Sequence, residues 1–138
     1  MDVIIFKNNG GGLSVITPSG PIEKCMKDIP QDAEYKIVDL SSITSDRTFR
    51  GAWEMGESGL NINIDKSKLI AHDKRREKRT KLMMPFDKII SRQIPGTDLA
   101  GAEANRVIIR EEHASIQTEI DNASDIESLK LIIENNDL

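Results

Sequence analysis

Residues 99–123, LAGAEANRVIIREEHASIQTEIDNA, decide the fold of the carboxyl-terminal half. A mostly apolar set of residues recurs there at alternating steps of four and three: Ala102, Arg106, Ile109, His113, Ile116, Ile120 and Ala123. This spacing places the set on one face of a helix and is typical of the seam between packed helices. Val107 and Ile108 are expected to widen that face. The stretch therefore predicts a long helix, from about residue 99 to residue 120, that packs against a partner helix.

The partner helix is predicted in the residues before this stretch. Asp65 is expected to cap it, and an apolar stripe follows a highly charged segment at steps of three and four. The stripe consists of Leu82, Met83, Phe86, Ile89, Ile90 and Ile94. Pro85 lies within the stripe, so the helix either kinks there or begins again with Pro85 in its first turn. Because Pro95-Gly96 makes a short connection, the two helices should fold back antiparallel.

The end of the chain predicts a short closing helix. Ser124-Asp125-Ile126-Glu127 has the form of a capping box, in which side chains satisfy the first backbone N–H groups of a helix. The apolar positions after it keep helical spacing, at Ile126, Leu129, Ile132 and Ile133.

Charge is distributed unevenly along the chain. The net charge is −3 over residues 1–64, +6 over residues 65–95 and −7 over residues 96–138, which gives −4 for the whole chain. We expect the basic arm 65–95 and the acidic segment 96–138 to face each other in the hairpin. Each exposed ion pair would add only about 0.2–1 kcal/mol, so the matching would favour one register rather than supply much stability.

Residues 1–64 are predicted to form a small β-rich domain. Residues 3–6 and 13–17 are strand-like, and the glycine-rich segment between them favours a hairpin over a phosphate-binding loop, because no helix follows it. Residues 35–38 and 60–65 predict two further strands. A short helix is expected over residues 22–29, with Cys25 as a small buried side chain on its apolar face.

Two arginines and two of the five aromatic residues lie within residues 46–54, DRTFRGAWE. Phe49 and Trp53 could anchor a turn into the sheet, with an arginine bonded to backbone carbonyls. Alternatively, an exposed aromatic and arginine patch has the composition of a protein-binding hot spot. The first interpretation is favoured because large rings are usually buried in a chain with so few. The candidate protein-binding residues are Arg47, Phe49, Arg50 and Trp53, together with Met83, Phe86 and Ile90 of the helical stripe.

Residues 35–39, YKIVD, and 46–54 resemble segments of a family of small proteins encoded by tailed phages and prophages. Its members share an opening hairpin of the Val-Ile-Ile-Phe, Asn-Gly-Gly, Val-Ile-Thr-Pro type, an "RIVD…DRTFRxAW" segment, and a basic helix in which a His precedes Arg or Lys. Residues 71–76, AHDKRR, are similar to that last element, so the resemblance covers most of residues 1–95. It implies an accessory protein, often from a structural or tail-gene neighbourhood, and transfers no catalytic residue. The basic helix is also loosely similar to parts of tail-fibre assembly proteins.

The basic stretch 74–81 also allows an interpretation as a nucleic-acid footprint. Six side chains there could neutralise phosphates: Lys74, Arg75, Arg76, Lys78, Arg79 and Lys81. No aromatic residue interleaves with them, and the net charge of the chain is negative. Protein contact is therefore favoured, with nucleic-acid binding as the alternative.

The remaining chemistry-bearing residues indicate no enzyme, cofactor or metal. His113 is expected to be a neutral histidine at the edge of the helical seam, and His72 to be solvated. A metal site between them would also need carboxylates such as Asp73 or Glu112 and is not favoured. The lone Cys25 cannot form a disulfide within the chain, and no nucleophile is spaced to pair with a histidine. No apolar run approaches the roughly 18 residues of a membrane span.

These features predict an α+β chain. A small amino-terminal antiparallel β-sheet with one short helix should occupy residues 1–64, and an antiparallel helical hairpin with a short closing helix should occupy residues 65–138. We expect a non-enzymatic phage or prophage accessory protein that acts through protein–protein contacts in virion or tail assembly. Its expected partners are other phage structural or assembly proteins, or a second copy of the chain. We expect it in the host cytoplasm or incorporated in the virion.

Overall fold

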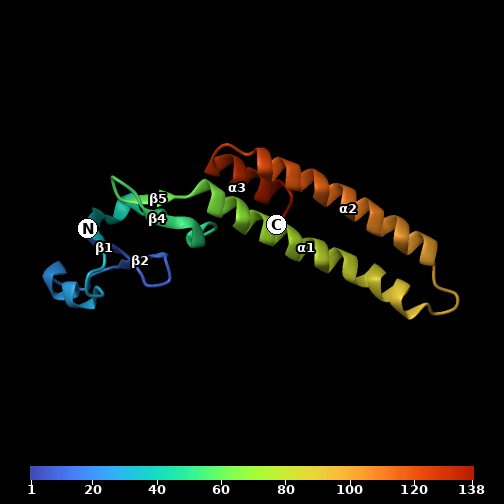
Figure 1. Cartoon of the computed structure of the whole chain (residues 1–138), viewed down its shortest axis with the longest axis horizontal. Coiled ribbons are helices and arrows are strands. Elements are labelled where there is room, and N and C mark those ends of the chain that lie inside the picture. The colour runs from blue at the N-terminus through green and yellow to red at the C-terminus, as the bar shows by residue number, and fades with distance from the viewer. The chain divides into compact units, whose positions relative to one another are not determined.

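The computed structural model describes residues 1–138 as two compact units, Met1–Ser67 and Lys68–Leu138. Antiparallel strands and short 3₁₀ helices precede a helical hairpin and a short closing helix (Figure 1). The predicted α+β class is therefore confirmed, including the order of its elements. None of the helices combines the length and apolar character that crossing a membrane requires.

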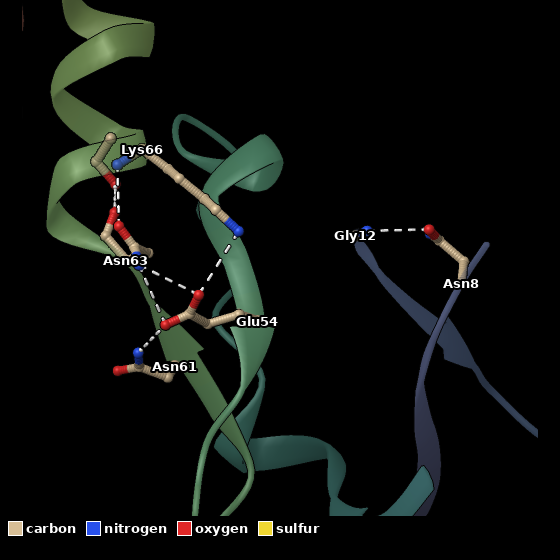
Figure 2. A network of polar contacts seen from close by, with 7 residues as sticks. Asn8, Gly12, Glu54, Asn61, Asn63 and Lys66 are labelled. Atoms are coloured by element: carbon tan, nitrogen blue, oxygen red, sulfur yellow. Dashed lines mark hydrogen bonds and ion pairs between the residues drawn. The ribbon is translucent and has the colours of Figure 1, made fainter. Parts of the chain in front are cut away.

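Strand β1 (Asp2–Lys7) is the centre of a three-stranded antiparallel sheet with the order β2-β1-β3. Its neighbours are β2 (Leu13–Ile16) and β3 (Tyr35–Asp39), and Ile4 lies between Ile16 and Ile37. The glycine-rich turn before β2 is a hairpin, as predicted: Asn8 Oδ1 accepts hydrogen bonds from the N–H groups of Gly10 (3.1 Å) and Gly12 (3.0 Å; Figure 2). Gly11, with φ +80°, takes a conformation that a side chain would disfavour.

A second, two-stranded sheet pairs β4 (Trp53–Met55) with β5 (Leu60–Ile62). The expected fourth strand therefore pairs with residues that the sequence indicated as an anchored turn, and it stops earlier because a helix begins at Ile64. Three 3₁₀ helices complete the unit: η1 (Ile22–Asp28), η2 (Leu40–Ser42) and η3 (Arg50–Ala52). The helix expected over residues 22–29 is thus of the tighter 3₁₀ type, and Cys25 on it is only partly buried.

The core of the first unit contains Ile5, Leu13 and Trp53, packed against one another and almost without exposure. Six partly buried side chains surround them: Val15, Val38, Ile43, Met55, Leu60 and Ile62. Burying a large apolar side chain contributes about 1.5–3 kcal/mol, so this small cluster supplies much of what holds the two sheets together.

The second unit consists of the hairpin of α1 (Ile64–Arg92) and α2 (Leu99–Asn122), with α3 (Ile126–Asn135). Helix α1 continues through Pro85 without a break, which leaves the carbonyl of Lys81 without its helical donor. The predicted seam of α2 is confirmed, since all but one of its members are buried: Ala102, Ile109, His113, Ile116, Ile120 and Ala123. The expectation that Val107 and Ile108 widen this face is wrong, because both side chains are exposed.

The helix caps differ in detail from the expectation. Asn63 rather than Asp65 caps α1, since its Oδ1 accepts the N–H of Lys66 at 3.0 Å. Asp98 caps α2, and Asp125 rather than Ser124 caps α3, where it accepts the N–H of Ser128 at 2.7 Å. In each case a short polar side chain satisfies an N–H group that the helix cannot.

Candidate functional site

The aromatic and arginine block lies in the core of the first unit. Phe49 and Trp53 are each 1% exposed. Arg50 lies over the Trp53 ring, 4.3 Å from its centroid, and donates from Nη2 to the carbonyl of Leu13 at 2.6 Å. Burial, and secondarily the charge of Arg47, lowers the pKa of Arg50 from its usual value. Of the four candidates in the block, only Arg47 is exposed, so this arrangement favours the interpretation in which the rings anchor the sheet.

A polar network joins the β4–β5 hairpin to the start of α1 (Figure 2). The carboxylate of Glu54 accepts from Asn61 Nδ2 at 2.9 Å and from Asn63 Nδ2 at 3.2 Å, and it lies 3.6 Å from Lys66 Nζ. Asn63 thus uses both ends of its amide, one for the helix cap and one for Glu54. Ser67, fully buried, donates to the Asn63 carbonyl at 2.7 Å. The network fixes where the strand ends and the helix begins.

Both histidines are buried between the helices of the second unit. His72 Nε2 lies 2.8 Å from Asp121 Oδ1, so the expectation of a solvated His72 is wrong. A hairpin whose turn is at Pro95-Gly96 brings residues about equally distant from it together, which sets His72 opposite the turn of helix that contains Glu119 and Asp121. The symmetry therefore indicates an acidic partner without deciding between the two. His113 is 2% exposed, as expected for a seam histidine. No three His, Cys, Asp or Glu side chains lie close enough to hold a metal ion.

Arg75 is the most buried member of the basic stretch, at 3% exposed. Its Nη1 makes a long hydrogen bond of 3.5 Å to the carbonyl of His113. Burial lowers the pKa of Arg75 from its usual value, and the charges of Arg79 and Arg76 add to the effect. Burial likewise lowers the pKa of His113, with Arg75 as the next cause. The seam therefore keeps His113 neutral beside a guanidinium.

The other basic residues of stretch 74–81 are divided among different partners. Arg76 pairs with Asp73 at 2.9 Å, and Lys81 pairs with Glu77 at 2.7 Å, both within α1. Lys78 Nζ donates to the carbonyl of Asn136 at 2.6 Å and to that of Asp137 at 3.1 Å. Lys74 and Arg79 make no ion pair within 4.0 Å. The stretch is therefore not one open row of cations.

Direct ion pairs between α1 and α2 are few. One is between Arg106 Nε and Asp87 Oδ1 at 2.9 Å, with the acid on the basic arm, and His72 makes a hydrogen-bonded contact to Asp121. Lys78 lies 3.9 Å from the carboxylate of Asp137, beyond the end of α3. The opposite net charges of the two segments thus lie side by side, but paired side chains account for little of the matching.

The distal hairpin, defined as residues 82–109, extends past the end of α3. Figure 1 shows α3 beside the part of the hairpin that lies farthest from the α1–α2 connection. The last residues of the chain reach only to the level of Leu82, where a hollow of ≈ 400 Å³ opens between Leu82, His113 and Asn136. Beyond it, α1 and α2 pack only against each other within the second unit.

Apolar side chains on both arms of the distal hairpin are consequently exposed. Ile94 is 50% and Ile108 57% exposed, and Met84, Leu99 and Val107 are also exposed. The candidates Met83, Phe86 and Ile90 are partly buried beside them. The distal hairpin is therefore a part of the second unit in which several apolar residues lack a covering element.

No family model, curated protein or solved structure matches the chain. The resemblance to the phage family thus stays a prediction based on its segments, YKIVD, DRTFRGAW and AHDKRR.

Proposed function

We propose that the chain is a non-enzymatic accessory protein of a tailed phage or prophage, and that it acts through protein–protein contacts in virion or tail assembly. The observation that carries the proposal is the distal hairpin, whose two arms expose apolar side chains past the end of α3. The segments that resemble those of the phage family support the biological setting. The protein would act in the host cytoplasm, where virions assemble, or within the particle.

Exposed apolar side chains on both arms give the distal hairpin the composition of a docking surface. Monomeric proteins rarely expose contiguous apolar patches of more than a few hundred Å², and larger patches usually mark a binding site. An amphipathic helix of a partner can lie along such a surface and insert side chains at steps of three and four. Ile94 near one side of the connection and Ile108 on the other arm would be covered by such a helix.

The proposal is tested by tagging the chain in a lysogen and capturing its partners, with crosslinking, before and after induction. Ile94→Glu and Ile108→Glu place a charge on the distal hairpin. Leu131→Glu is the matched control, because Leu131 on α3 is 56% exposed and lies outside that surface. Circular dichroism and thermal unfolding establish that all three variants remain folded.

We expect virion or assembly proteins of the phage to be captured after induction by the unchanged chain and by Leu131→Glu. The two distal variants should lose at least about tenfold in apparent affinity, equivalent to about 1.4 kcal/mol. Capture of host proteins alone, or equal capture of phage proteins by all variants, would contradict the proposal.

A further inference from the structure

Strand β3 forms one edge of the three-stranded sheet, and half of its backbone groups point away from the sheet. The flanking hydrogen bonds, Lys7 N–H to the Glu34 carbonyl (3.0 Å) and Leu40 N–H to the Met1 carbonyl (2.8 Å), set the alternation of its ladder with β1. Residues 34, 36, 38 and 40 therefore bond to β1, and residues 35, 37 and 39 face outward. The N–H and C=O groups of Tyr35 and Ile37 have no partner within the chain.

Apart from the charged Asp39 at its end, whose carboxylate pairs with the N-terminal amine at 3.1 Å, this edge lacks the features by which proteins usually protect an exposed strand. Such edges commonly carry an outward lysine, a proline or a bulge. In β3 the single lysine, Lys36, is turned toward the β4–β5 connection, where its Nζ donates to the carbonyls of Gly56 and Glu57 at 2.6 Å each. Tyr35 and Ile37, 44% and 49% exposed, remain as apolar side chains on an unpaired edge.

The opposite edge of the sheet, strand β2, already contacts other parts of the first unit. The Leu13 carbonyl of β2 accepts a hydrogen bond from Arg50 at 2.6 Å, and β2 also contacts β4. A strand that extends this sheet must therefore add at β3.

We propose that two copies of the chain pair through β3, antiparallel and centred on Ile37, so that one six-stranded sheet runs across the dimer. A twofold contact needs only a surface that complements itself, and the outward groups of residues 35, 37 and 39 meet that requirement. The Asp39 carbonyl keeps its hydrogen bond from Ser42 Oγ (2.7 Å) and offers its second lone pair to the other copy. Each Ile37 exchanges two hydrogen bonds with the partner's Ile37. Tyr35 of each copy lies opposite Asp39 of the other.

Charge disfavours the neighbouring register centred on Lys36, and strand length disfavours the one centred on Val38, which would set Tyr35 opposite Ser41, beyond the end of β3. Centring the pair on Lys36 would also match outward groups, but it would place the two lysines directly opposite each other, which destabilises a strand pair. Centring on Ile37 sets Lys36 opposite Val38 and brings no like charges together. It also sets the two exposed isoleucines side by side, so each covers the other. The dimer uses a different surface from the distal hairpin and does not depend on the proposed function.

The test is the mass of the full chain in solution, measured by sedimentation equilibrium and native mass spectrometry across a dilution series. We expect twice the 15.4 kDa of one chain, dissociating on dilution. Ile37→Pro removes an outward N–H and no donor of the ladder to β1. Ile37→Lys sets like charges opposite each other. Both variants should raise the dimer dissociation constant at least about tenfold, while Ile108→Lys and Leu131→Lys should leave it unchanged.

If a variant of Ile37 fails to fold, amide hydrogen exchange of the unchanged chain tests the same contact without a substitution. The amides of Tyr35 and Ile37 should gain protection as concentration rises, while those of exposed loop residues should not. A chain that is monomeric at every concentration would overturn the proposal. So would a dimer that is lost in Ile108→Lys and kept in both Ile37 variants, or one whose Tyr35 and Ile37 amides exchange freely.

Discussion

At the scale of single residues, Trp53 is the largest fully buried side chain of the first unit. It packs against Ile5 and Leu13, and Arg50 covers its ring. We expect Trp53→Ala to lower the free energy of unfolding by about 3–5 kcal/mol. Trp53→Phe should cost less, because the indole N–H is buried without an acceptor and its removal relieves an unpaired polar group.

Urea unfolding followed by circular dichroism measures both changes. If residues 46–54 are instead a binding hot spot, the opposite effects of Trp53→Ala are expected. On that interpretation Trp53→Ala would keep nearly full stability and lose its captured partners. Comparing capture by Trp53→Ala and Trp53→Phe at temperatures where both are folded separates the two.

His113 should make stability depend on pH. Its folded-state pKa is below its usual value near 6.5, so the unfolded chain binds the proton more readily. The contribution of the neutral imidazole is therefore fully present above pH 6.5 and is lost as the pH falls through 6.5 toward the folded-state pKa. Arg75, Lys78 and Arg79 of α1 oppose protonation there, and Glu112 of α2 favours it.

We expect the free energy of unfolding of the unchanged chain to fall relative to that of His113→Leu as the pH is lowered from 7.5 to 5.5. Urea unfolding at a series of pH values measures this difference. Comparison with the variant removes the contributions common to both proteins, such as that of Asp39, whose pKa is lowered to about 2 chiefly by the side chain and N–H of Ser41. A constant difference across this range would mean that His113 titrates alike in both states.

At the scale of elements, the start of α1 depends on one amide. We expect Asn63→Ala to lower the free energy of unfolding by about 0.5–2 kcal/mol, because it removes both the helix cap and a donor to Glu54. Asp65→Ala is the matched control. Asp65 is exposed one residue into the helix and should change stability by less than about 0.5 kcal/mol. Urea unfolding measures both changes. An equal loss of unfolding free energy in the two variants would contradict the assignment of Asn63 as the cap of α1.

The helices were predictable because their signals are local. The 4-3 spacing from Ala102 to Ala123 identified a buried seam, and the short Pro95-Gly96 connection predicted the hairpin. Periodicity does not tell how far a covering element extends, and so Ile108 was expected to be buried. Strand β4 was missed because three residues are too short to show alternation and its pairing with β5 is not local.

For the candidate site residues, the sequence did not predict which side chains would be buried or what they would contact. The composition of the aromatic block correctly favoured burial of its rings. Nothing in the composition of the basic stretch distinguished buried Arg75 from Arg76, because that depends on which face of α1 meets α2. The edge of β3 has a signal in the apolar, charged, apolar order of Tyr35, Lys36 and Ile37, but only pairing with β1 shows that the edge is open.

At the scale of the whole molecule, the division of charge concerns the choice between protein and nucleic acid as the partner. A chain of net charge −4 must concentrate its cations to attract a polyanion. The basic arm does so in sequence, yet in the structure Arg75 is buried and Lys78 is held by carbonyls near the chain end. Two more cations are neutralised by neighbours on the same helix. Most of the positive charge of the basic stretch is thus buried, hydrogen-bonded or ion-paired within its own unit.

We therefore expect no salt-dependent binding of duplex or single-stranded DNA beyond the weak non-specific range of about 10⁻⁴–10⁻⁶ M. A mobility-shift or anisotropy titration at low and at moderate salt measures this, with a variant in which all six basic residues of 74–81 are neutralised as the reference. If the unchanged chain does bind, Lys74 and Arg79, which lack ion pairs, are the residues that must contact phosphate. Lys74→Gln and Arg79→Gln would then each reduce the salt slope by about 1. That result would make the basic face of α1, rather than the distal hairpin, the primary binding surface.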